Sequence, residues 1–139
     1  MLVSMFQWQV RVYYEDTDSG GVVYYANYLR FMERARTEWM RTLGFEQDRL
    51  IREEGIVFAV RSANVDFLRP ARFNDLLSVS LEVVQRGRAS LTFNQVVARC
   101  EDEQVPLCSA QVKIACLDAV SFRPHPIPDY ILKEIPDVS

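Results

Sequence analysis

YYEDTDSGGVVYYANYLRFMERARTEWMRTLG, residues 13–44, contains the longest periodic apolar pattern in the chain. Apolar side chains recur at helical spacing in its second part: Tyr28, Met32, Ala35, Trp39 and Leu43. This spacing predicts one long helix with a single apolar face. Gly44 follows the last periodic residue, where glycine commonly ends a helix in the left-handed conformation.

An acidic turn precedes the predicted helix. It contains Glu15, Asp16 and Asp18, and Gly20 and Gly21 follow. The first backbone N–H groups of a helix lack internal partners and carry partial positive charge. A carboxylate beside such donors suits acyl transfer, with a base or nucleophile facing an oxyanion site. The same acids could instead only cap the helix and complement its dipole, so the local pattern leaves both interpretations open.

The rest of the chain is dominated by strand patterns, in which apolar and polar residues alternate. Such segments occur at residues 6–15, 63–67, 77–83, 91–97 and 108–116. Gly87-Arg88 predicts a tight hairpin turn, and residues 46–55 predict a short amphipathic helix. We therefore expect an α+β fold, a curved antiparallel sheet of about five strands wrapped around one long helix. Its edges would need cover, which predicts a homo-oligomer.

The composition fits one domain spanning residues 1–139, with 49% hydrophobic and 25% charged residues. A net charge of -3 argues against a nucleic-acid-binding protein, although 16 Lys and Arg residues leave room for a local phosphate site. The N-terminal residues do not have the pattern of a signal peptide, and no apolar run has the length of a membrane span. A cytoplasmic location is therefore predicted.

Metal and disulfide chemistry are not expected. Cys100, Cys108 and Cys116 are odd in number and lie in strand-like segments, so they are interpreted as reduced, buried side chains. The chain has no C-x-x-C motif, and only His125 could join a cysteine as a zinc ligand. His125 itself is interpreted as a surface residue. We predict no metal and no cofactor.

Three chemistries could use the acidic segment that begins at Asp16. An EF-hand loop needs Asp or Asn at its fifth position and Glu at its twelfth, where this chain has Gly20 and Asn27. A phosphatase nucleophile would follow a fully buried parallel strand, whereas the segment before Asp16 alternates between polar and apolar residues. The third chemistry is acyl transfer on a thioester, for which the acidic turn and the helix start would supply the reacting groups.

The segment RVYYEDTDSGGVVYYANYLRFMERARTEWMRTLGF, residues 11–45, closely resembles the start of the 4-hydroxybenzoyl-CoA thioesterase family of hotdog-fold enzymes. It is most similar to the Tol–Pal-associated acyl-CoA thioesterase branch. The shared pattern is D-x-D-x-x-G-x-V, an aromatic pair, and then Asn and Tyr in the helix. Looser similarity continues through VDFLRPARFNDLL and GRASLTF to the last strand. The resemblance implies hydrolysis of acyl-CoA to free acid and CoA by a homodimer or homotetramer.

The resemblance also implies roles for single residues. It places the catalytic carboxylate, as nucleophile or general base, at Asp18 and makes Asp16 structural. Tyr25 falls where the family has the backbone N–H that holds the thioester oxygen. Tyr14, on the predicted strand, is expected to orient the acid or the substrate. The Tol–Pal branch usually has His at the position of Tyr25, whereas the hydroxybenzoyl enzymes have Tyr, so an imidazole-assisted mechanism would differ here.

Coenzyme A carries phosphates, which prefer Arg or Lys donors. Arg86, Arg88 and Ser90 cluster at the predicted hairpin, and Arg123 follows the last strand. The resemblance suggests that they bind the nucleotide, with residues from more than one subunit; as turn residues they could also simply be solvated. Two other functions stay open: a hotdog dehydratase, which would need a His near the helix start, and a non-catalytic protein that holds an acyl chain or a partner.

Overall fold

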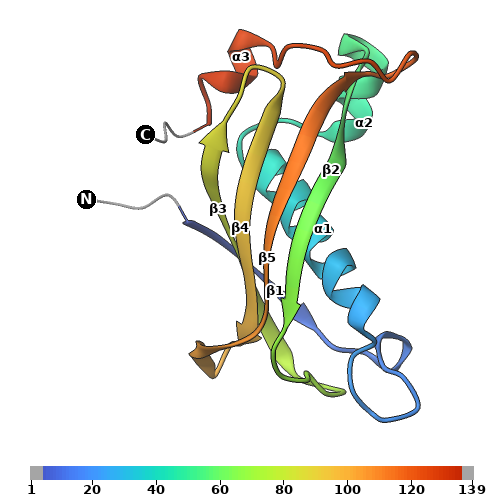
Figure 1. Ribbon diagram of the computed structural model, residues 1–139, viewed down its shortest axis with the longest axis vertical. Helices are drawn as coiled ribbons and strands as arrows, with labels where there is room; N and C mark the ends of the chain where they lie inside the picture. Colours follow the sequence, from blue (N-terminus) through green and yellow to red (C-terminus); the bar gives the residue numbers. More distant parts are fainter. Residues whose placement is uncertain (1–4, 136–139) are drawn as a thin grey trace.

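The computed structural model describes residues 5–135, which form a five-stranded antiparallel sheet curved around a long helix (Figure 1). The strands are β1 (Met5–Arg11), β2 (Ile56–Phe67), β3 (Leu76–Arg86), β4 (Ser90–Arg99) and β5 (Asp102–Asp118). The helices are α1 (Tyr25–Thr42), α2 (Gln47–Arg49) and α3 (Asp129–Leu132), with a 3-10 turn at Tyr14–Asp16 and a π-helical turn at Leu50–Glu54. The strand order is β1-β3-β4-β5-β2, which confirms the predicted α+β architecture.

The predicted apolar stripe of α1 forms the helix side of the core. Buried stripe residues are Tyr28, Met32, Ala35 and Trp39, joined by Phe31 and Met40. Gly44 has φ 97°, and its N–H donates to the Arg41 carbonyl (2.9 Å). The Phe45 N–H donates to the Met40 carbonyl (2.9 Å), which completes the expected glycine-terminated helix end.

The sheet side of the core comes from alternate residues of β3, β4 and β5, including Leu77, Val79, Leu91, Phe93 and Val112. The β3–β4 hairpin was predicted with Gly87-Arg88 as its turn, but the Gly87 N–H donates to the Ser90 carbonyl (2.8 Å). The two turn residues are therefore Arg88 and Ala89, one position later. Gly87 is favoured beside this turn because an added Cβ would lie 2.7 Å from Ser90 Oγ.

The first strand is shorter than the alternating pattern predicted. It ends at Arg11, and the prediction that Tyr14 lies on it is wrong. The carboxylate of Asp16 accepts a hydrogen bond from the Tyr13 N–H (2.8 Å), which draws the backbone into the 3-10 turn. Alternation of side chains does not reveal such competition from a local side chain for backbone donors. No helix among residues 5–135 has the length and apolar character needed to cross a membrane.

Candidate active site

The acidic turn forms a small hairpin in front of α1. Thr17 and Val23 form an antiparallel bridge, and the Asp18 N–H donates to the Val22 carbonyl (2.9 Å). The Gly21 N–H donates to the Asp18 carbonyl (3.0 Å), and Gly21 has φ 79°, a conformation that favours glycine. These contacts fix the backbone on both sides of Asp18.

Asp16 joins this hairpin to the helix. Its side chain is buried, and its carboxylate accepts hydrogen bonds from the Tyr13 N–H (2.8 Å) and from Asn27 Nδ2 (3.0 Å). Its carbonyl accepts the N–H of Tyr24, the residue that precedes α1 (2.9 Å). Its burial and its two satisfied carboxylate oxygens are what a structural acid needs.

Asp18 has the opposite environment. Its side chain is exposed, and Oδ1 accepts a hydrogen bond from the Gly20 N–H (2.8 Å). This contact closes a turn that orients the carboxylate without burying it. The Asp18 carboxylate is therefore fixed in direction by one hydrogen bond and is exposed, so a second molecule can contact it.

The start of α1 supplies hydrogen-bond donors. Tyr24 is the N-cap residue, and its side chain accepts no capping hydrogen bond from the helix. Asn27 N–H donates to the Tyr24 carbonyl (2.8 Å), but the Tyr25 and Ala26 amides have no acceptor within residues 5–135. Two backbone donors at the positive end of an 18-residue helix are thus available to an oxygen atom of a ligand.

Three exposed rings surround this helix start, and we call Tyr24, Tyr25 and Phe67 the aromatic patch. The Tyr25 ring lies 4.7 Å from the Tyr24 ring and 5.7 Å from the Phe67 ring, measured between centroids. The hydrogen bond with the Tyr25 side chain raises the pKa of Tyr24. Beneath the patch, the buried hydroxyl of Tyr28 accepts the Ala71 N–H (3.0 Å), and burial raises its pKa. The helix start is thereby fixed to the chain after β2.

Tyr14 points to a different neighbour. Its ring is 75% exposed and stacks on Phe73 at 3.9 Å, with 10° between the ring planes. Its carbonyl accepts the Thr17 hydroxyl (2.8 Å). Tyr14 therefore has a defined contact on the flank of the acidic hairpin, and the role expected for it stays a prediction.

The residues predicted to bind nucleotide lie at the other end of the sheet. Arg86 donates from Nη1 to the carbonyls of Leu132 (3.0 Å) and Ile135 (2.9 Å), so it holds the C-terminal segment. Arg88 is exposed, and its carbonyl accepts the Ile127 N–H (2.9 Å), which places the hairpin beside residues 123–127.

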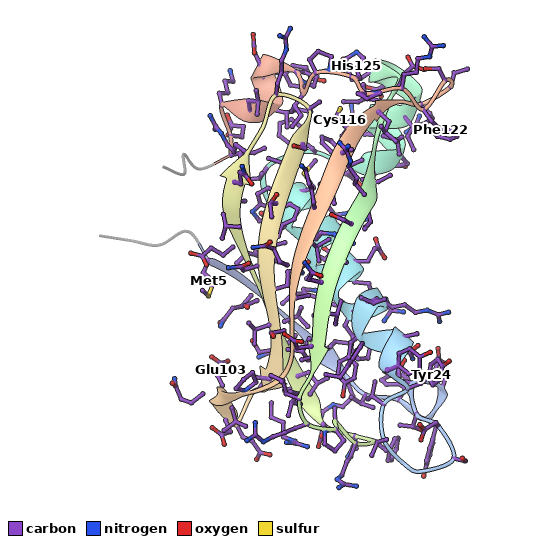
Figure 2. The ribbon with its side chains drawn as sticks, in the orientation of Figure 1. Met5, Tyr24, Glu103, Cys116, Phe122 and His125 are labelled. Carbon is purple, nitrogen blue, oxygen red and sulfur yellow. The ribbon has the colours of Figure 1, made fainter. Side chains whose placement is uncertain are left out.

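Ser90 begins β4 and pairs with Ala115, while Arg123 is exposed and accepts the Asp118 N–H on its carbonyl (2.8 Å). Figure 2 shows His125 and Phe122 at this end and Tyr24 at the opposite one. The 12 residues of β2 run between the two ends, a length of roughly 35–40 Å. Within one chain these residues therefore lie at one end of the sheet, away from Asp18.

Two features of this region do not follow from the sequence pattern. An amide side chain in the first turn of the helix is a signal for a contact of Asn27 with the acidic turn. Only the fold places Asn27 Nδ2 3.0 Å from Asp16 Oδ1. The pattern around Phe67 predicts an ordinary strand residue, although the Phe67 ring packs against Tyr25. No cluster of three or more His, Cys, Asp or Glu side chains suited to a metal ion lies within residues 5–135.

Comparison with known proteins gives consistent matches. A family model described as "Thioesterase superfamily" matches residues 20–106. The chain is 41% identical over 134 residues to the acyl-CoA thioester hydrolase YbgC of Escherichia coli O6:H1, covering 96% of this chain and 98% of that one. It is 44% identical over 128 residues to the acyl-CoA thioesterase YbgC of Haemophilus influenzae, covering 92% of each. A probable thioesterase from Bartonella henselae superposes with a TM-score of 0.84 at 34% identity, covering 90% of this chain and 100% of that structure.

Proposed function

The chain belongs to the thioesterase superfamily and hydrolyses acyl-CoA thioesters, and we propose that the Asp18 carboxylate and the Tyr25 amide perform the reaction. Its curved sheet around α1 is the hotdog fold of its structural neighbours. The observation that supports the assignment is the held, exposed carboxylate of Asp18 on the loop that leads directly into the uncapped helix start. A thiol-release assay with aliphatic and aromatic acyl-CoAs measures the activity and its acyl preference.

The proposed reaction uses the helix start as the oxyanion site. The thioester oxygen accepts the Tyr25 N–H, and the helix dipole stabilises the negative charge that develops there. If Asp18 attacks the carbonyl carbon, an acyl-aspartyl anhydride forms, the CoA thiolate leaves, and water cleaves the anhydride to regenerate the carboxylate. If Asp18 is a general base, it takes a proton from the attacking water and returns it to the sulfur. An acyl mass on the chain after rapid quench of a single turnover supports the first route. Neither route requires a metal.

The same proposal requires a second copy of the chain. Strand β2 is an edge strand, and its residues from Val60 to Phe67 are exposed apart from half-buried Val65, so it offers unpaired backbone groups and apolar side chains. Two copies pairing β2 with β2 about a two-fold axis would run antiparallel. The Asp18 end of one copy would then lie beside the arginine end of its partner. This arrangement supports a site built from two chains.

The assembly can be tested at its edge. Each chain has a mass of 16.1 kDa, and we expect sedimentation to give two or four times this value. Ala63→Lys places a charge on the exposed edge strand and is expected to favour the monomer and reduce turnover at the same concentrations. Gln111→Lys, at an exposed position of the central strand β5, is the matched control and should change neither. A wild-type chain that sediments at its single mass with full activity would contradict the proposal.

We propose that Arg88, Ser90 and Arg123 contact the nucleotide of CoA, with Arg86 holding the adjacent C-terminal segment. Arg88→Ala is expected to raise KM for an acyl-CoA about tenfold, the loss of one charged hydrogen bond. An acyl-N-acetylcysteamine thioester, which lacks the nucleotide, should show no change. Arg49→Ala is the control, because Arg49 is an exposed arginine that pairs with Glu53. Equal effects on the two substrates would contradict a role for Arg88 in nucleotide binding.

We also propose a cytoplasmic location. The thiols of Cys100, Cys108 and Cys116 are all free, which fits a reducing compartment. Burial raises the pKa of Cys108 to about 12 and that of Cys116 to about 11, so these two thiols are poor nucleophiles. Cell fractionation followed by the thiol-release assay checks the location, and activity confined to the cell exterior would contradict it.

A further inference from the structure

A cavity lies between the later part of α1 and the sheet. Its volume is about 200 Å³. The helix contributes Glu33, Arg36 and Trp39 to its wall, and the strands contribute Phe58, Phe93 and Ile114. Arg36 follows Tyr25 by 11 positions, which is about 16 Å along the helix axis. The cavity is therefore well separated from the oxyanion site proposed at the start of the same helix.

A buried amide holds the Arg36 guanidinium at this cavity. Nη1 of Arg36 donates to Oε1 of Gln95 (2.9 Å), and Gln95 is fully buried at 0% exposure. The Nε2 atom of Gln95 in turn donates to the Met32 carbonyl (3.1 Å), which fixes the direction of the amide. A guanidinium has five N–H donors, and Gln95 accepts one of them. Within residues 5–135 Arg36 forms no ion pair with a carboxylate.

The charge of Arg36 is incompletely balanced. Burial lowers the pKa of its guanidinium, and the charge of nearby Glu33 opposes this shift. The Glu33 side chain is exposed and accepts a hydrogen bond from the Thr37 hydroxyl (2.7 Å). Arg36 is half-buried, and a cation partly withdrawn from water without a paired anion is unfavourable, so an anionic group in the cavity would compensate for the lost hydration.

We propose that this cavity binds a small organic carboxylate, with its charge on Arg36 and its apolar body against Trp39 and Phe93. Guanidinium and carboxylate match as a two-hydrogen-bond pair. An apolar cavity of roughly 150 Å³ accommodates benzene, so this one is large enough for one ring with a carboxyl group. Trp39 and Phe93 already pack edge to face at 5.3 Å and form one aromatic wall. The proposal does not depend on the role of Asp18.

Trp39 provides a direct readout of binding. The chain has two tryptophans, so Trp8→Phe leaves Trp39 as the only one. Benzoate is expected to change the Trp39 fluorescence saturably, and neutral benzamide, of the same size, is expected to bind about tenfold more weakly. Equal affinity of the two compounds, or no saturable change up to roughly 50 mM benzoate, would overturn the proposal.

Variants test the charge of the site in the same Trp8→Phe background. Arg36→Met should weaken benzoate about tenfold while leaving benzamide unchanged, because only the charged contact is lost. Glu33→Gln should strengthen benzoate binding, because a neighbouring negative charge is removed. If Arg36→Met does not fold, as judged by circular dichroism, the benzoate–benzamide comparison and the Glu33→Gln variant test the proposal in its place.

Tyr25→Pro tests whether benzoate binds at this cavity or at the proposed catalytic site. It should leave the Trp39 response to benzoate unchanged, because the altered amide is about 16 Å away along the helix. A loss of benzoate binding in Tyr25→Pro as large as in Arg36→Met would place the ligand at the helix start and overturn the proposal.

Discussion

Asp18→Asn is expected to keep the fold and lower kcat/KM for acyl-CoA by about 10²–10⁴-fold. The asparagine oxygen can still accept the Gly20 N–H, so the turn that holds the side chain survives. What is lost is the negative charge, and with it the ability to attack a carbonyl or to take a proton from water. Steady-state thiol release measures the loss of kcat/KM, and circular dichroism checks that the fold is kept.

Two neighbouring acids are controls for this variant. Glu15→Gln neutralises an exposed carboxylate in the same turn and should leave turnover unchanged. Asp16→Asn should act on stability, because both oxygens of Asp16 accept hydrogen bonds and an amide supplies only one acceptor atom. The expected cost is about 1–3 kcal/mol in the free energy of unfolding. Turnover by Asp18→Asn at the wild-type rate would rule out Asp18 as nucleophile or base.

Tyr25→Pro is expected to lower kcat by about 10²–10³-fold, the usual effect of removing one oxyanion donor. Tyr25 is the first residue of α1, and proline is well accepted at that position because its N–H is not used within the helix. The preceding Tyr24 has φ -62° and ψ 131°, an extended conformation that a following proline favours. The substitution therefore removes the amide proton with little demand on the backbone.

Tyr25→Phe and Tyr25→Ala complete the test. Both keep the N–H, so turnover should remain close to wild type if the backbone is the oxyanion donor. Circular dichroism and thermal unfolding should show that α1 forms in the proline variant. A proline variant with full turnover, or a large loss in Tyr25→Phe, would shift the role from the amide to the phenol.

Much of the fold was predictable because it depends on local periodicity. The stripe from Tyr28 to Trp39 predicted α1, and alternation predicted the strands, since each pattern reports which side of an element is apolar. The same reasoning failed at Tyr14, where the Asp16 carboxylate competes for backbone donors. The hairpin was placed one residue early because several positions near Gly87 suit a turn, and only strand register selects among them.

The sequence by itself determined a five-stranded sheet on one long helix, with an acidic turn at the helix start, because these features follow from spacing between near neighbours. Only the tertiary structure showed the physical difference between two acids: Asp16 is buried against Asn27, whereas Asp18 is exposed. It alone brought Arg36 of α1 to Gln95 of β4, which are 59 residues apart. Burial and pairing between distant residues depend on how elements pack, and no local pattern encodes that.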